Sequence, residues 1–213
     1  MQEYIFDFDG TLADSGKTGI LATQEAFKDF SLPIPTSETV NYYMGIPIEV
    51  SFKKMAPHHS FSQQEFEDLM ECFRMYYKKN ELTNVTLFHG ISTTLETLVQ
   101  QSKSLYVVSS KNSIALLRNL ENLKIANYFT DIVGSDQVHH FKPAPDGVLS
   151  LIKKYRLDPN DCIMIGDAIF DLQMGKAAGV HTCGVTWGAH DAQNLMKEKP
   201  DFLLNTAEEL LSI

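Results

Sequence analysis

The feature that most constrains the fold is an alternation, from Leu87 to the C-terminus, of short apolar runs with amphipathic helical patterns. The apolar runs are rich in β-branched and aromatic residues, which is typical of buried strands. A run of the same kind, Tyr4–Phe8, stands near the N-terminus. Apolar strands that alternate with helices predict a parallel sheet covered on both faces. We therefore predict an α/β fold with a Rossmann-like parallel sheet core.

Turn and cap residues bound the predicted elements of this region. The predicted strands after the first are Leu105–Val108, Phe129–Val133, Cys162–Ile165, His181–Thr186 and Phe202–Leu204. The predicted helices are Ser92–Gln101, Ser113–Leu123, Pro145–Tyr155, Phe170–Ala178, Asp191–Lys197 and Ala207–Leu211.

Between Lys17 and about Lys79 the pattern changes to apolar residues at helical spacing, and we predict no strand there. Thr36 and Ser62 stand where helix N-caps are expected. Prolines and glycines divide the stretch into about four helices. The sequence therefore predicts an all-helical insert after the first strand, with the aromatic residues Phe73, Tyr76 and Tyr77 packing in its interior.

Polar residues follow the predicted strands at the points where the strands end. In such a sheet, ligands bind beyond the carboxyl ends of the strands, near the switch in strand order. We expect these polar side chains to meet at one edge of the sheet. They are Asp7, Asp9 and Thr11 after the first strand, Ser109, Ser110, Lys111 and Asn112 after the second, Lys142 in a later loop, and Asp167 and Asp171 after Ile165.

This set of side chains suits phosphoryl transfer. Asp7 and Asp9 are two apart, so they lie on one side of an extended chain and need a positive partner. Carboxylates of Asp7 and Asp167 can hold Mg²⁺, which takes oxygen ligands. Lys142 and the hydroxyl of Ser109 can bind phosphate oxygens, and Gly10 lets the first loop turn sharply. Phosphoryl transfer also needs a nucleophile that attacks phosphorus and a proton donor for the leaving group.

Composition narrows the classes of partner. The formal net charge is −9, which argues against nucleic acid or an acidic membrane surface as the main partner. No apolar run approaches the roughly 20 residues of a membrane span, and no signal peptide precedes the first strand. The three cysteines, Cys72, Cys162 and Cys183, form no paired motif. We therefore expect a cytoplasmic protein that acts on a small phosphorylated metabolite.

Four segments taken together resemble the motifs of the haloacid dehalogenase (HAD) superfamily of phosphatases. They are Asp7-Phe8-Asp9-Gly10-Thr11, Ser109 after an apolar strand, Lys142 in a Lys-Pro-x-Pro segment, and Gly166-Asp167-Ala168-Ile169-Phe170-Asp171. The resemblance covers essentially the whole chain and is greatest to the phosphoglycolate-phosphatase-like branch. It implies a catalytic core of residues 1–15 and 84–213 and an inserted all-α cap domain of residues 16–83.

The resemblance also implies a role for each site residue. Asp7 would be the nucleophile that forms an aspartyl-phosphate, and Asp9 would protonate the leaving group and then activate water. Asp7, Asp167 and the backbone carbonyl of Asp9 would hold Mg²⁺. Phosphate would be bound by Ser109, Ser110, Lys142 and the backbone of Phe8, while Thr11 and Asp171 would orient these groups.

The prediction is a Mg²⁺-dependent phosphatase for a small, phosphoglycolate-like monoester. Three alternatives stay open. Pyrophosphatases and sugar-phosphate mutases of the same superfamily would use the same site. A phospho-aspartate signalling module would share the acids, the hydroxyl and the lysine, although it would lack the helical insert and the Gly-Asp-x-x-x-Asp segment.

Overall fold

The computed structural model describes all of residues 1–213, and it confirms the predicted parallel sheet. Six strands pair in the order β5-β4-β1-β6-β7-β8, and every neighbouring pair is parallel. The strands are β1 (Glu3–Phe6), β4 (Ser104–Val108), β5 (Asp131–Val133), β6 (Cys162–Gly166), β7 (His181–Val185) and β8 (Phe202–Leu204).

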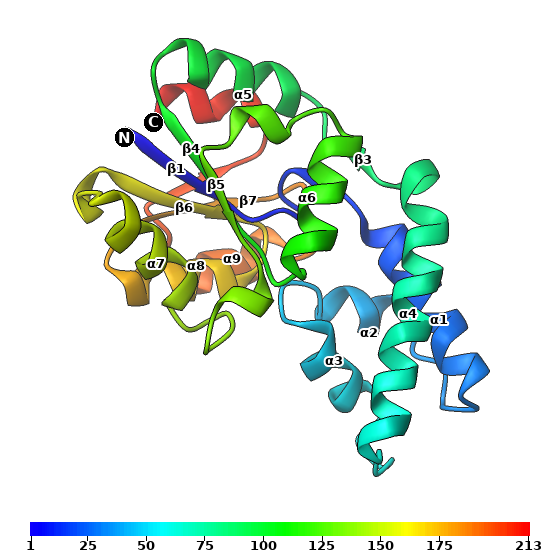
Figure 1. Ribbon diagram of the computed structural model, residues 1–213. Coiled ribbons are helices and arrows are strands. Elements are labelled where there is room, and N and C mark those ends of the chain that lie inside the picture. Colours follow the sequence, from blue (N-terminus) through cyan, green and yellow to red (C-terminus); the bar gives the residue numbers. More distant parts are fainter.

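Helices cover both faces of this sheet (Figure 1). The helices of the core are α5 (Ile91–Gln100), α6 (Ser113–Asn122), α7 (Asp146–Tyr155), α8 (Ile169–Ala178) and α9 (Ala192–Lys197). Alternate side chains of each strand face opposite ways. Phe6 and Val107 therefore pack towards α5 and α6, whereas Ile5 and Met164 pack towards α7 and α8.

Strand order places β1 next to β6 at the centre of the sheet. The chain leaves β1 towards β4 and β5, and it leaves β6 in the opposite direction, towards β7 and β8. A ligand crevice is expected outside the carboxyl ends of two such strands. Phe6 is in register with Ile165, and the Asp7 amide donates to the Ile165 carbonyl at 2.8 Å, so both loops leave the sheet at one level.

The predicted insert is a group of four helices at this end of the sheet (Figure 1). They are α1 (Gly16–Asp29), α2 (Ser37–Tyr42), α3 (Ile48–Met55) and α4 (Gln63–Asn84). Thr36 and Ser62 cap α2 and α4 as predicted, and Glu65 completes a capping box with Ser62. Phe27, Phe52 and Leu69 are fully buried in the apolar interior that joins the helices.

Three details differ from the predicted elements. The first strand ends at Phe6, and Phe8 is buried inside the following loop instead of in the sheet. A short antiparallel pair, β2 (Ala13–Asp14) with β3 (Thr86–Leu87), joins the two chain crossings into the insert and was not predicted. The closing helix, Ala207–Ser212, is a 3₁₀ helix. No helix has both the length and the apolar character needed to cross a membrane.

Candidate active site

The loop after β1 turns back sharply on itself, and this turn determines where its acidic side chains point. The Phe8 carbonyl accepts hydrogen bonds from the amides of Leu12 and Ala13, both at 3.0 Å. Gly10 makes the reversal possible with φ = +88°, a conformation in which only glycine is unstrained. A Cβ at Gly10 would lie 2.2 Å from Oδ2 of Asp167, so the glycine also gives room to the neighbouring carboxylate.

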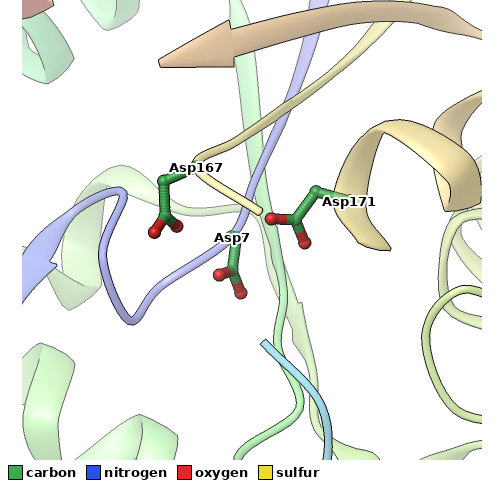
Figure 2. A group of neighbouring side chains, drawn as sticks. All are labelled: Asp7, Asp167 and Asp171. Carbon is green, nitrogen blue, oxygen red and sulfur yellow. The ribbon is translucent and has the colours of Figure 1, made fainter. Parts of the chain in front are cut away.

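Three buried carboxylates from three segments face one another at the carboxyl ends of β1 and β6 (Figure 2). Asp7 follows β1, Asp167 follows β6, and Asp171 lies in the first turn of α8. One oxygen from each lies within 4.8 Å of the others, and no side chain is more than 2% exposed. Carboxylates packed so closely repel one another unless a cation lies among them.

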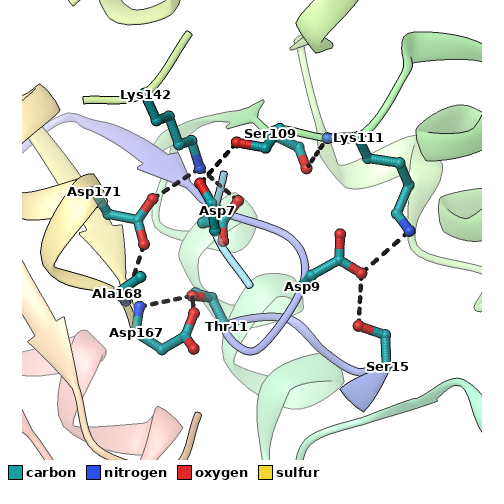
Figure 3. Close-up of polar contacts among 12 residues, drawn as sticks. Asp7, Asp9, Thr11, Ser15, Ser109, Lys111, Lys142, Asp167, Ala168 and Asp171 are labelled. Atoms are coloured by element: carbon teal, nitrogen blue, oxygen red, sulfur yellow. Dashed lines mark hydrogen bonds and ion pairs between the residues drawn. The ribbon is translucent and has the colours of Figure 1, made fainter. Parts of the chain in front are cut away.

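Lys142 supplies part of that positive charge from the loop before α7 (Figure 3). Its ammonium donates to Asp7 Oδ1 at 2.6 Å and to Asp171 Oδ1 at 2.8 Å. Burial would lower the pKa of Lys142, but the charges of Asp171 and Asp7 outweigh it and raise the pKa above its usual range. Lys142 is therefore a permanent cation at neutral pH, and one ammonium cannot neutralise three carboxylates.

Asp167 is held from two sides by neighbouring loops. Thr11 Oγ1 donates to Asp167 Oδ1 at 2.9 Å, and the Ala189 amide donates to Oδ2 at 2.6 Å. Burial and the charge of Asp171 nevertheless raise the pKa of Asp167 to about 7. Burial likewise raises the pKa of Asp7 well above its usual value, although Lys142 opposes this. The site therefore has excess negative charge that a cation would relieve.

The residues present fit a magnesium ion. All donors of the cluster are carboxylate oxygens, which a small hard cation prefers. Gly10 and Gly188 flank the Asp167 carboxylate so closely that a Cβ on either would lie within 2.3 Å of it. Two glycines thus keep the space around this carboxylate open.

The Asp9 side chain belongs to a different set of contacts (Figure 3). Ser15 Oγ donates to Asp9 Oδ1 at 2.6 Å, and the ammonium of Lys111 lies 3.2 Å from the same oxygen. Lys111 also donates to the hydroxyl of Tyr77 on α4 at 2.8 Å, and it lies over the Tyr77 ring. The two carboxylates of the first loop, Asp7 and Asp9, therefore have separate surroundings.

Ser109 and Ser110 lie in the loop after β4, beside this site. Ser109 is buried, and its Oγ accepts a hydrogen bond from the Lys111 amide at 3.2 Å, which leaves its O–H free to donate. The Ser110 hydroxyl instead donates to the carbonyl of Gly45 in the insert at 2.8 Å. Of the two hydroxyls, that of Ser109 is the one free to meet a ligand.

A cavity of about 340 Å³ separates the carboxylates from the insert. Its walls come from the core, through Asp7, Asp9 and Ser109, and from all four insert helices. The small loops after β1 and β4 therefore open directly towards the side chains of the insert.

The structure brings together every residue predicted for the site. Lys142 bonds Asp7 and Asp171, and Thr11 bonds Asp167, which has a carboxylate oxygen within 4.8 Å of the other two acids. Asp9, Ser109 and Ser110 lie beside them on the adjoining loops, and Phe8 is buried between Asp7 and Asp9. Two further residues of the site, Ser15 and Tyr77, were not among the candidates. Lys111 was expected at this edge of the sheet because it follows a predicted strand, but it was given no role, and the structure places it beside Asp9. Tyr77 carried no such signal.

Comparison with known proteins agrees with this geometry. The family model described as haloacid dehalogenase-like hydrolase matches residues 4–185. The chain belongs to the haloacid dehalogenase-like hydrolases. A phosphoglycolate phosphatase of Aquifex aeolicus is 30% identical to it, covering 100% of this chain and 96% of that protein.

Two further similar proteins also match over nearly the whole length of both chains. The pyrophosphatase PpaX of Listeria welshimeri is 28% identical over 98% of this chain and 94% of its own. The solved structure of a haloacid dehalogenase-like family protein from Streptococcus pneumoniae has a TM-score of 0.86 and 28% identity, covering 100% of this chain and 97% of that one. The protein is accordingly a hydrolase of the phosphatase type within the haloacid dehalogenase-like family.

Proposed function

We propose that this haloacid dehalogenase-like hydrolase is a Mg²⁺-dependent phosphatase that cleaves a small, phosphoglycolate-like phosphate monoester through a phosphorylated Asp7. The observation that carries the proposal is the separation of the two acids of the first loop. Asp7 lies in the buried carboxylate cluster, whereas Asp9 faces the cavity with Ser15 and Lys111. A nucleophile and a proton-transfer group need such different surroundings.

In the first step, Asp7 Oδ2 attacks the phosphorus, because Oδ1 is held by Lys142. The bond from phosphorus to the ester oxygen breaks, and Asp9 donates a proton to that oxygen, which leaves as an alcohol. In the second step, Asp9 takes a proton from water as the water oxygen attacks phosphorus. The bond to Asp7 breaks, so that inorganic phosphate leaves and both side chains return to their starting states.

The remaining polar residues would hold the phosphate and the metal. Ser109, Lys142 and the backbone N–H of Phe8 would donate to phosphate oxygens, and Ser110 would do so through its backbone N–H, since its hydroxyl is used by Gly45. Asp7, Asp167 and the Asp9 carbonyl would hold Mg²⁺. When bound, the ion would neutralise the charge between a carboxylate nucleophile and a phosphate dianion.

Residues 16–83 would serve as a cap over this site. All four insert helices line the cavity above the carboxylates, and Ser110 and Lys111 of the core bond to Gly45 and Tyr77 of the insert. The β2–β3 pair joins the two crossings, so it is the natural hinge. Closure would exclude water from the phosphorylated intermediate and place the leaving group against the insert.

Phosphate release from a panel of esters tests the proposal. Phosphoglycolate and simple alkyl phosphates should be hydrolysed with Mg²⁺ and not with EDTA, and Asp7→Asn should abolish turnover. Asp131→Asn is the matched control, since Asp131 is a partly exposed acid paired with Lys154 far from the cluster. Turnover by Asp7→Asn near the unaltered rate would refute the role of Asp7.

Pyrophosphate is the second candidate substrate, because relatives named pyrophosphatase align with 98% of the chain. The same assay decides between them: release of two phosphates from pyrophosphate, faster than one from phosphoglycolate, would favour it. An isomerised sugar phosphate without net phosphate release would instead favour a mutase. The family match favours hydrolysis over a signalling module.

A further inference from the structure

Lys111 lies beside the reacting groups and has no role in the proposed phosphoryl transfer. It stands in the loop after β4, where its backbone is fixed by two hydrogen bonds. Its amide donates to Ser109 Oγ at 3.2 Å, and its carbonyl accepts from the Ser135 amide at 3.0 Å. The side chain is only 11% exposed, and it lines the cavity. A buried charge is costly unless it is paired, so the contacts of the ammonium are the guide to its function.

The Lys111 ammonium joins an acid of the core to the insert. It lies 3.2 Å from Asp9 Oδ1, and it donates to the Tyr77 hydroxyl at 2.8 Å. The centres of the Tyr77 and Phe8 rings lie 4.1 Å and 5.6 Å from the ammonium, so two aromatic rings complete its surroundings. Burial would lower the pKa of Lys111, but the charge of Asp9 outweighs it and raises the pKa above its usual range. Lys111 is therefore a cation at neutral pH.

Both polar contacts of the Asp9 carboxylate are made by one of its oxygens (Figure 3). Ser15, at the start of α1, donates to Oδ1 at 2.6 Å, and Lys111 pairs with the same oxygen from the loop after β4. The other oxygen, Oδ2, makes no hydrogen bond in the protein, and it is not among the polar atoms that are buried without a partner. Since Asp9 lines the cavity, Oδ2 is the oxygen that is open to a ligand.

One contact alone would not fix this carboxylate. The last torsion of an Asp side chain is soft, so a carboxylate held by a single hydrogen bond can still turn. A second contact to Oδ1 from a different element removes that freedom and keeps Oδ2 towards the cavity. A general acid must lie about 2.6–3.2 Å from the atom that it protonates. A displacement of about 1 Å can cost about 100-fold in rate.

Tyr77 makes the position of Lys111 depend on the insert. A lysine side chain is long and flexible, and fixing it costs conformational entropy. Tyr77 is 7% exposed and packs in the same apolar cluster as Phe8, so its hydroxyl is a rigid acceptor on α4. An insert that lay away from the sheet would leave the ammonium with Asp9 as its one polar side-chain partner.

We propose that Lys111 is a positioning residue for Asp9: it holds Oδ1, so that Oδ2 meets the leaving-group oxygen and then the attacking water, and Tyr77 of the insert keeps Lys111 in place. The inference rests on the acid–base role that the proposed function gives to Asp9. It adds no bond-making step, because the proton moves through Asp9 alone.

Three esters assayed with Mg²⁺ at one pH test this positioning. The leaving groups of ethyl phosphate and phosphoglycolate need the proton of Asp9, whereas that of p-nitrophenyl phosphate needs little protonation. Lys111→Met should lower kcat/KM about tenfold to 100-fold for the two alkyl esters and less than about threefold for p-nitrophenyl phosphate. For p-nitrophenyl phosphate, kcat and KM should fall together, because Asp9 still has to activate water after the leaving group has gone.

Tyr77→Phe tests the contribution of the insert. It keeps the Lys111 cation and the aromatic ring but removes the hydroxyl, so it should give the same pattern with smaller losses. Tyr76→Phe is its control, because the Tyr76 hydroxyl donates to Asp29 on the surface of the insert. Lys154→Met is the control for Lys111→Met, because it breaks an ion pair with Asp131 away from the cavity. Neither control should change kcat/KM for any of the esters.

A double-mutant cycle tests whether Lys111 acts through Asp9. Asp9→Asn alone should lower kcat for p-nitrophenyl phosphate. Adding Lys111→Met to Asp9→Asn should lower kcat by less than about twofold more, because a residue that acts only through Asp9 has nothing left to position.

Additive effects in this cycle, or equal losses for alkyl and p-nitrophenyl esters, would overturn the inference. A loss confined to phosphoglycolate, with ethyl phosphate unchanged, would also overturn it, because Lys111 would then bind the substrate carboxylate directly. Unchanged rates for Asp9→Asn itself would instead overturn the acid–base role in the proposed function, and the inference with it. If Lys111→Met does not fold, Tyr77→Phe gives the same readout with the buried cation retained.

Discussion

Replacing Lys142 with methionine tests the charge balance of the carboxylate cluster. The ammonium is 3% exposed and bonds Asp7 at 2.6 Å and Asp171 at 2.8 Å. Lys142→Met keeps most of the side-chain volume but leaves two buried carboxylates without their cation. Removing one member of a buried pair costs about 3–5 kcal/mol of the free energy of unfolding. We expect a loss of that size at pH 8 without Mg²⁺.

The loss should depend on pH with a defined sign. The Lys142 ammonium lowers the pKa of Asp7, which burial and the neighbouring acids raise, so its removal raises that pKa further. A carboxyl whose folded-state pKa is raised loses stability as pH rises above its unfolded value of 3.8. Protonation at lower pH relieves the unbalanced negative charge of the variant, so it should lose less stability at pH 5 than at pH 8. Lys142 itself stays charged across this range.

Urea unfolding at both pH values with EDTA gives the measurement, and Lys154→Met is the matched control. Lys154 pairs with Asp131 at 2.7 Å on the surface, where its side chain is 61% exposed. Such pairs are worth less than about 1 kcal/mol. Equal losses for Lys142→Met at the two pH values, or a loss no larger than that of Lys154→Met, would refute the reasoning.

Three further predictions concern the metal and the contact between core and insert. Apparent Mg²⁺ affinity should rise about fivefold from pH 6 to pH 7 and less above it, because the pKa of Asp167 is about 7 and binding requires its carboxylate. Affinity that is constant by calorimetry would contradict this. Gly10→Ala should abolish the rise in Tm that Mg²⁺ causes, because the added Cβ would collide with the Asp167 carboxylate. Gly179→Ala is the control: Gly179 has a similar positive φ, but a Cβ there would meet open space, so this variant should keep the rise in Tm. Glu81→Gln should cost about 1–3 kcal/mol in urea unfolding at pH 7, because Glu81 accepts hydrogen bonds from Arg118 and Asn119, and an unchanged midpoint would contradict this.

The sequence predicted the sheet well because its strands are apolar on both faces. The run from Cys162 to Ile165 needs helices on both sides, and the structure provides them. The end of the first strand was placed two residues late, because Phe8 is as apolar as a strand residue but is buried in the loop. Hydrophobicity reports burial and does not report which backbone conformation buries a residue.

The β2–β3 pair could not be predicted, since two-residue strands carry no periodicity. The pairing joins Ala13 to Leu87, which lie far apart in the sequence and meet only in the folded protein. The sequence could not predict that the closing helix is a 3₁₀ helix, because over so short a length the spacing of its apolar residues fits an α-helix and a 3₁₀ helix equally well.

Site residues could be predicted from the sequence where polar residues directly follow an apolar strand. Asp7 and Asp167 stand out because they follow apolar strands, and the structure brings them together. Tyr77 did not stand out, because an aromatic residue in a helical pattern indicates packing. It does pack in the core, yet its hydroxyl also accepts a hydrogen bond from Lys111 of the core. That second role depends on how the insert lies over the sheet.

The most direct test of the account is to trap the covalent intermediate. Asp9→Asn should slow the attack of water, while p-nitrophenyl phosphate, with a leaving group that needs little protonation, should still phosphorylate the protein. After rapid acid quenching, peptide mass spectrometry should find a phosphoryl group on Asp7 in an amount close to one per protein. Release of p-nitrophenol without any phosphorylated Asp7, or a phosphoryl group on a different residue, would contradict the account.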